Sequence, residues 1–130
     1  GGIVSTPSDI AKWARDLYAG PILAAPQRAE LETYVDTSTG EPLAQASAKS
    51  PRGFGLGVTE MYKDPIGKFF FYEGETLGYR VAHIYVPATD TVIVVGLNSQ
   101  TAEKRDHIGP FTAQIYETLV KRGLVPAVAP

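Results

Sequence analysis

Residues 53–98 consist of short apolar runs, each about as long as a β-strand, joined by short turns. No other feature of the sequence restricts the possible folds of this chain as strongly. Three of these runs are rich in aromatic or β-branched residues, as strands are: residues 69–72, 79–86 and 91–98. The turn signals at residues 64–67 and 87–90 each combine proline with aspartate. Because parallel neighbours need a long crossover, connections this short predict antiparallel pairing. With a run at residues 53–58 that alternates with glycine, we expect a sheet of about four strands.

Helix signals lie on both sides of this region. The first helix is expected to begin at Thr6, because a capping side chain is followed by Pro7 and by an acid, Asp9, in the first turn. Its apolar residues recur at helical spacing: Ile10, Trp13, Ala14, Leu17 and Tyr18. Gly20 and Pro21 are expected to end it.

Two further helices complete the predicted elements. One is expected from Pro26 to about Val35, and a polar loop at residues 36–52 follows it. The other is expected to begin near Pro110 and to stop at Gly123. Its predicted apolar face consists of Phe111, Ile115 and Leu119. The chain is therefore predicted to be α/β of the α+β type, with an antiparallel sheet flanked by N-terminal helices and a C-terminal helix.

The 130 residues suit a single domain. We divide it into a helical part with its loop (1–52), the antiparallel strands (53–98), and a C-terminal helix and tail (99–130). The chain begins Gly1-Gly2-Ile3 and shows neither an initiator methionine nor a signal peptide. We therefore expect a processed product, an engineered truncation or a degradation fragment.

The composition excludes several classes of function. A net charge of −2 with no basic stripe gives no electrostatic basis for binding nucleic acid. No apolar run approaches the roughly 20 residues of a membrane helix. With no cysteine and two histidines, the sequence predicts no disulfide, no metal site and no cofactor. His83 is expected to be a packed strand residue, and Trp13, Tyr18 and residues 69–71 are expected to lie in the core.

Several segments carry a resemblance to a known family. Residues 1–10 read Gly-Gly-Ile-Val-Ser-Thr-Pro-Ser-Asp-Ile, residues 53–57 read Gly-Phe-Gly-Leu-Gly, and residues 72–80 read Tyr-Glu-Gly-Glu-Thr-Leu-Gly-Tyr-Arg. A proline turn and a strand ending in Asn98 follow. In order and spacing these segments resemble the serine β-lactamase-like family, which includes class C β-lactamases, D-alanyl-D-alanine peptidases and related esterases. The resemblance implies a fragment of the β-lactamase/transpeptidase-like fold.

In this family a serine is acylated, and the machinery is Ser-x-x-Lys, Tyr-x-Asn and then Lys-Thr-Gly or His-x-Gly. Neither of the first two motifs occurs in this chain, so the resemblance implies that the nucleophile and its base lie upstream. The third motif falls on Tyr72 and Gly74, and the backbone N–H of Glu75 then forms half of the oxyanion hole. Thr76 and Arg80 are the expected substrate-binding residues.

Tyr72 departs from the Lys or His of the family. A phenol with an ordinary pKa near 10 is neutral at pH 7, so it brings no positive charge to a substrate carboxylate. This favours a neutral ester or amide over a β-lactam or a D-amino-acid peptide, unless Arg80 supplies the missing charge. The alternative interpretation of Arg80 is an exposed strand residue that pairs with nearby acids.

Two functions are consistent with these observations. In the first, the chain is the C-terminal segment of a serine hydrolase that acts on a small-molecule or peptide substrate, and it is inactive alone. In the second, it is a non-catalytic binding or assembly module derived from that fold. An exposed sheet edge predicts a homo-oligomer. The family implies a periplasmic or secreted bacterial protein.

Overall fold

Three α-helices and a seven-stranded sheet make up the computed structural model, which describes residues 2–99 and 107–128. The helices are α1 (Pro7–Tyr18), α2 (Ala25–Leu31) and α3 (Ile108–Lys121). The strands are β1 (Tyr34–Asp36), β2 (Pro42–Leu43), β3 (Arg52–Phe54), β4 (Thr59–Lys63), β5 (Gly67–Thr76), β6 (Tyr79–Val86) and β7 (Thr91–Leu97). Within the predicted C-terminal part, residues 100–106 and 129–130 lie outside the described residues.

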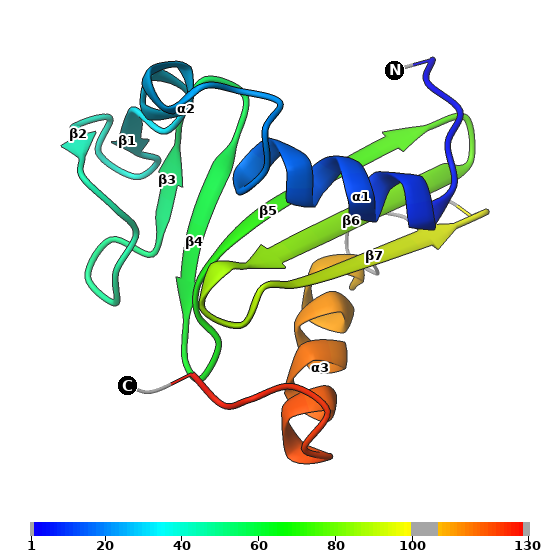
Figure 1. Cartoon of the computed structure of the whole chain (residues 1–130). Coiled ribbons are helices and arrows are strands. Elements are labelled where there is room, and N and C mark those ends of the chain that lie inside the picture. Colours follow the sequence, from blue (N-terminus) through cyan, green and yellow to red (C-terminus); the bar gives the residue numbers. More distant parts are fainter. Residues whose placement is uncertain (1, 100–106, 129–130) are drawn as a thin grey trace.

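Every pair of neighbouring strands is antiparallel, in the order β2-β1-β3-β4-β5-β6-β7 (Figure 1). This confirms the α+β class, but the sheet has seven strands rather than about four. Three strands were not predicted: β4, β1 and β2. β1 covers the end of the predicted second helix and the first residue of the predicted loop, β2 lies within that loop, and they are three and two residues long. A strand of two or three residues is too short to show an alternation of apolar and polar residues in the sequence. Such a strand forms because it pairs with its neighbours, not because of local preference.

The second helix ends earlier than its sequence pattern predicts. α2 stops at Leu31, and Tyr34 and Val35 belong to β1 instead. Tyr34 is buried in the core cluster that also contains Tyr18 of α1. Burial of this ring against the sheet outweighs the weak helix preference of tyrosine and valine.

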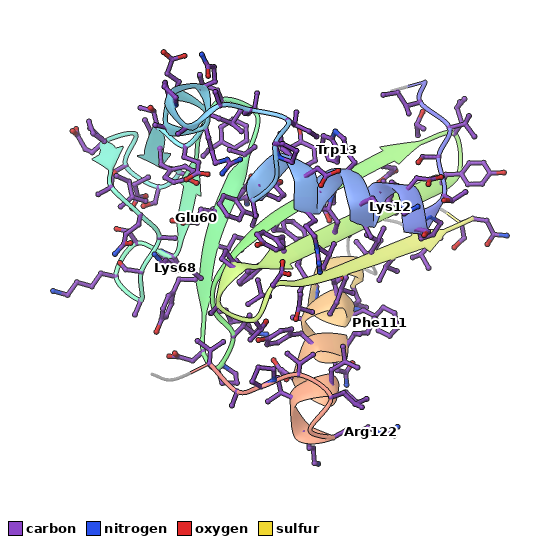
Figure 2. The ribbon with its side chains drawn as sticks, in the orientation of Figure 1. Lys12, Trp13, Glu60, Lys68, Phe111 and Arg122 are labelled. Carbon is purple, nitrogen blue, oxygen red and sulfur yellow. The ribbon has the colours of Figure 1, made fainter. Side chains whose placement is uncertain are left out.

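The first helix begins where its capping signal predicts. Thr6 is the N-cap, and its Oγ1 accepts a hydrogen bond of 3.2 Å from the backbone N–H of Asp9. Ala14 and Tyr18 are buried against the sheet. Trp13, in contrast, is 49% exposed, so its predicted core position is wrong. Figure 2 shows this side chain projecting from one side of α1 rather than beneath the helix.

Two hydrophobic clusters lie on opposite faces of the sheet, each under one of the long helices (Figure 1). On one face α1 crosses the sheet above Phe70 and Tyr85, and both rings stack with Tyr18. On the other face α3 packs above Ile84 and Ile93. The side chains of β5 and β6 therefore alternate between a surface under α1 and a surface under α3.

The buried face of α3 differs from the predicted one. Ile108, Thr112, Ala113 and Tyr116 are buried, whereas Phe111 is 49% exposed. Ile115 and Leu119 are partly buried against the core, as predicted. The helix ends as expected before Gly123, whose φ of 70° permits the left-handed turn there. None of the described helices has both the length and the hydropathy to cross a membrane.

Candidate active site

The C-terminal half of β5, residues 72–76, pairs with a strand on one side only. β4 pairs with β5 only as far as Phe71, whereas β6 continues along β5 to the pair of Thr76 with Tyr79. Within the described residues, no strand adjoins the β4 side of residues 72–76. This stretch holds the predicted third motif, so an extended ligand can approach the motif along the side that β4 leaves uncovered.

Alternation along β5 places Tyr72, Gly74 and Thr76 on the face of the sheet that carries α1. Tyr72 lies directly opposite His83 of β6, which contacts Tyr18 of α1. The Tyr72 side chain is 45% exposed, so a ligand at the strand edge can reach its hydroxyl. The structure thus brings these three predicted site residues together on one face.

An aromatic cluster lies beside Tyr72, in which Tyr18 and His83 are buried and Trp13 is exposed. The hydroxyl of Tyr18 and Nε2 of His83 are 3.2 Å apart, within hydrogen-bond distance, and the Trp13 ring meets the imidazole edge-on at a centroid distance of 6.0 Å. Burial lowers the pKa of His83 to about 4. Burial, and then the neighbouring Tyr72, raise the pKa of Tyr18 to about 12. Both groups are neutral at pH 7, so the surroundings of Tyr72 gain no charge from them.

This cluster was not predicted from the sequence. Helical spacing placed Tyr18 on the apolar face of α1, and His83 was expected to be packed, which its exposure of 6% confirms. No local pattern connects the two residues, because they are 65 positions apart. Only the crossing of α1 over β6 brings them into contact.

Gly74 has room for a side chain within this chain. A Cβ atom at this position would meet Cγ1 of Val81 at 3.7 Å, which is an ordinary contact. The added side chain would project from the same face as Tyr72, into the space that a ligand would occupy. Just beyond, Leu77 and Gly78 both have positive φ, at 45° and 84°, and form a type I′ hairpin turn. Leu77 is 93% exposed at its tip.

Arg80 lies on the opposite face from Tyr72. It pairs in register with Glu75, and alternation directs Arg80, Glu73 and Glu75 toward the α3 side. Its side chain is 6% exposed, and its nitrogens lie 3.8 Å from Glu73 Oε2 and 3.5 Å from Glu75 Oε2. The expected pairing with nearby acids is present, but the side chain is buried rather than exposed. The substrate-binding role of Arg80 stays a prediction, and its position weighs against that role.

The described part of the chain thus combines an antiparallel sheet, helices on both of its faces, and a glycine-containing strand edge that no strand covers. A family model described as Beta-lactamase matches residues 1–117 of the 130. The chain therefore belongs to the Beta-lactamase family, as the motif resemblance predicted. No curated protein and no solved structure matches the chain significantly. The family match extends beyond Asn98, where the motif resemblance ended, into α3.

Proposed function

We propose that this chain is the C-terminal segment of a serine hydrolase that works through a covalent acyl-enzyme. The upstream part supplies the Ser-x-x-Lys nucleophile, and this segment supplies Tyr72, Gly74 and the backbone N–H of Glu75 as half of the oxyanion hole. The observation that carries the proposal is the open edge of β5 at residues 72–76, inside a match to the Beta-lactamase family.

We further propose that the substrate is a neutral ester or amide. Tyr72 brings no charge to the face of the motif, and His83 beside it is kept neutral by burial. Arg80, near the start of β6, lies on the far face between two glutamates. A carboxylate on the substrate would thus find no positive partner among these three residues, whereas an uncharged acyl group needs none.

The test compares this chain with the protein that includes its upstream sequence. We expect the longer protein to hydrolyse p-nitrophenyl acetate, a neutral ester, faster than nitrocefin, which carries a carboxylate. We expect the chain alone to hydrolyse neither, because it holds no Ser-x-x-Lys. Hydrolysis by the chain alone would contradict the upstream nucleophile. Inactivity of both proteins would favour a non-catalytic binding or assembly module.

Replacing Tyr72 by lysine in the longer protein tests the choice of substrate. We expect Tyr72→Lys to raise the ratio of nitrocefin to ester turnover by about tenfold, because an ammonium at this position can pair with a carboxylate. The matched control is Phe111→Lys, since Phe111 is similarly exposed but lies on α3. An unchanged ratio in Tyr72→Lys would show that position 72 does not determine charge selectivity.

We also propose that the chain forms a homodimer through β7. The sheet ends at β2 on one side and at β7 on the other. β2 is two residues long and contains Pro42, which protects that edge. β7 has seven residues, Thr91–Leu97, with neither a charge nor a proline among them. Antiparallel pairing of two copies centred on Val94 would place Asp90 opposite Asn98, so no like charges would meet.

Light scattering after size-exclusion chromatography tests the dimer. We expect wild type to show twice the chain mass of 14.0 kDa. Val94→Lys should be monomeric, because two ammonium groups would meet at the two-fold axis. Val35→Lys, on the interior strand β1, is the control and should remain dimeric. A monomeric wild type at high concentration would overturn this proposal.

A further inference from the structure

The turn between β5 and β6 determines which backbone groups of β5 face the open side. The turn has two residues and joins Thr76 to Tyr79, so this pair exchanges hydrogen bonds and closes the hairpin. In an antiparallel ladder, such pairs alternate with pairs that make no hydrogen bond to each other. The next pair, Glu75 with Arg80, is of the second kind. The N–H and C=O of Glu75 therefore point away from β6, toward the open side.

Glu73 presents its backbone in the same direction. It pairs with Ala82, two positions further along the ladder than Glu75, so its N–H and C=O also point away from β6. β4 stops pairing with β5 at Phe71, and the turn between β5 and β6 extends away from β4 (Figure 1). Within the described residues, no strand pairs with the backbone groups that Glu73 and Glu75 direct to this side. The open side thus displays the backbone of the two residues that flank Gly74.

The side chains of the same two glutamates project to the α3 face and meet one cation. Arg80 Nε lies 3.5 Å from Oε2 of Glu75, and Arg80 Nη2 lies 3.8 Å from Oε2 of Glu73. The Arg80 side chain is 6% exposed, whereas the side chains of Glu73 and Glu75 are 43% and 38% exposed. A guanidinium carries its donors in a rigid plane, so it can hold two carboxylates at once. Arg80 therefore links the residue before Gly74 to the residue after it.

The conformation of Gly74 controls the direction of the N–H in the proposed oxyanion hole. This N–H belongs to the planar peptide unit between Gly74 and Glu75, so rotation about ψ of Gly74 turns it toward the open side or away from it. Glycine restricts its own torsions less than any other residue, and β4, which could limit them, does not reach this position. An oxyanion is stabilised most by a donor that is already directed at it. The Glu75 N–H therefore needs a restraint from elsewhere in the fold.

Arg80 is placed to supply this restraint from the far face. It belongs to β6, which pairs with strands on both sides: Arg80 lies opposite Glu75 of β5 and opposite Leu97 of β7. A buried side chain on a strand with two neighbours moves less than the strand edge that it contacts. Rotation at Gly74 must displace the residue before it or the residue after it. The ion pairs of Arg80 with both glutamates oppose either displacement.

We propose that Arg80 is a positioning residue: by holding the side chains of Glu73 and Glu75 on the α3 face, it keeps the N–H of Glu75 directed at the reacting oxygen on the open side. This role rests on the proposed serine hydrolase function, because the oxyanion hole serves acyl transfer. Arg80 acts through the backbone of β5 and not on the substrate, so the role differs from the substrate binding that the sequence predicted. It also suits a side chain that lies on the opposite face from Tyr72.

Nitrogen relaxation measured by NMR on this chain tests the restraint without a catalytic assay. We expect backbone order parameters near about 0.85 along residues 73–76 of wild type. The triple variant, Arg80→Met with Glu73→Gln and Glu75→Gln, removes the ion pairs without leaving an unpaired charge, and circular dichroism checks that it stays folded. Its order parameters in this stretch should fall below about 0.6. Arg15→Met, which removes an exposed ion pair, is the control and should leave them unchanged. Unchanged order parameters in a folded triple variant would overturn the proposal.

Ester hydrolysis by the protein that includes the upstream sequence tests the consequence. The triple variant should lower kcat for p-nitrophenyl acetate at least about tenfold and change KM by less than about twofold, because the Glu75 N–H stabilises the transition state more than the bound ester. Arg15→Met should keep both constants. A wild-type kcat in the triple variant would overturn the role of Arg80, although an active wild type would still support the hydrolase. If wild type hydrolyses no ester, the proposed hydrolase function fails, and the role of Arg80 fails with it.

Discussion

We expect the free energy of unfolding of this chain to fall by about 3 kcal/mol between pH 7 and pH 4, because the buried imidazole of His83 resists protonation. Burial lowers its pKa from 6.5 to about 4. His83 is 6% exposed and lies between β5, β7 and α1, so no water replaces the solvation that a charged ring would need.

The sign follows from proton binding. Between pH 4 and 6.5 the unfolded chain carries a proton on His83 that the folded chain does not, so stability rises with pH across this window. The contribution is fully present above 6.5 and lost below 4. Asp36 acts in a different window: hydrogen bonds from Ser38 and then Ser50 lower its pKa from 3.8 to about 2, so its contribution is lost only as the pH falls below 3.8.

Urea unfolding at pH 7, 5.5 and 4 measures the effect. The double variant His83→Phe with Tyr18→Phe removes the titrating ring together with the hydroxyl bonded to it, so no buried polar group is left unpartnered. It should lose most of the pH dependence between 4 and 6.5. His107→Asn is the control, because His107 is exposed before α3. A double variant with the slope of wild type would assign the pH dependence to other groups.

Local signals were sufficient for the elements that carry the third motif. β6 spans Tyr79–Val86 as predicted, because its apolar run is bounded by a turn on each side. The Thr6 cap fixed the start of α1. β1 and β2 could not be predicted, since a two- or three-residue strand exists only through its partners.

Only part of the candidate site could be predicted, because the rest depends on the register in which β5 pairs with β6. Alternation alone places Tyr72, Gly74 and Thr76 on one face. The face of Arg80 depends on the length of the turn, because a two-residue loop at Leu77 and Gly78 pairs Thr76 with Tyr79 and hence Glu75 with Arg80. That loop could have been recognised from its glycine. The contact of Tyr18 with His83 could not, because the two residues lie on α1 and β6, which only the fold brings together.

Arg80→Ala is the substitution for which we expect the largest loss of stability outside the core, about 3 kcal/mol in the free energy of unfolding. The Arg80 side chain is 6% exposed and lies near Glu73 and Glu75. Truncation would remove a buried cation and its apolar stem, and it would leave two like charges on one face of β5 without their shared counterion. Urea unfolding at pH 7 measures the loss.

Arg15→Ala provides the matched control, because Arg15 also pairs with a carboxylate, Asp90 at 3.1 Å, but both side chains are at least half exposed. Exposed pairs contribute little, so this variant should lose less than about 1 kcal/mol. Replacing Arg80 by methionine together with Glu73→Gln and Glu75→Gln should recover most of the stability, since a neutral side chain of similar length fills the buried space without stranding a charge. If the free energy of unfolding falls no more in Arg80→Ala than in Arg15→Ala, the Arg80 cluster contributes no more stability than a surface ion pair. Packing alone would then stabilise the β5–β6 hairpin that carries Tyr72.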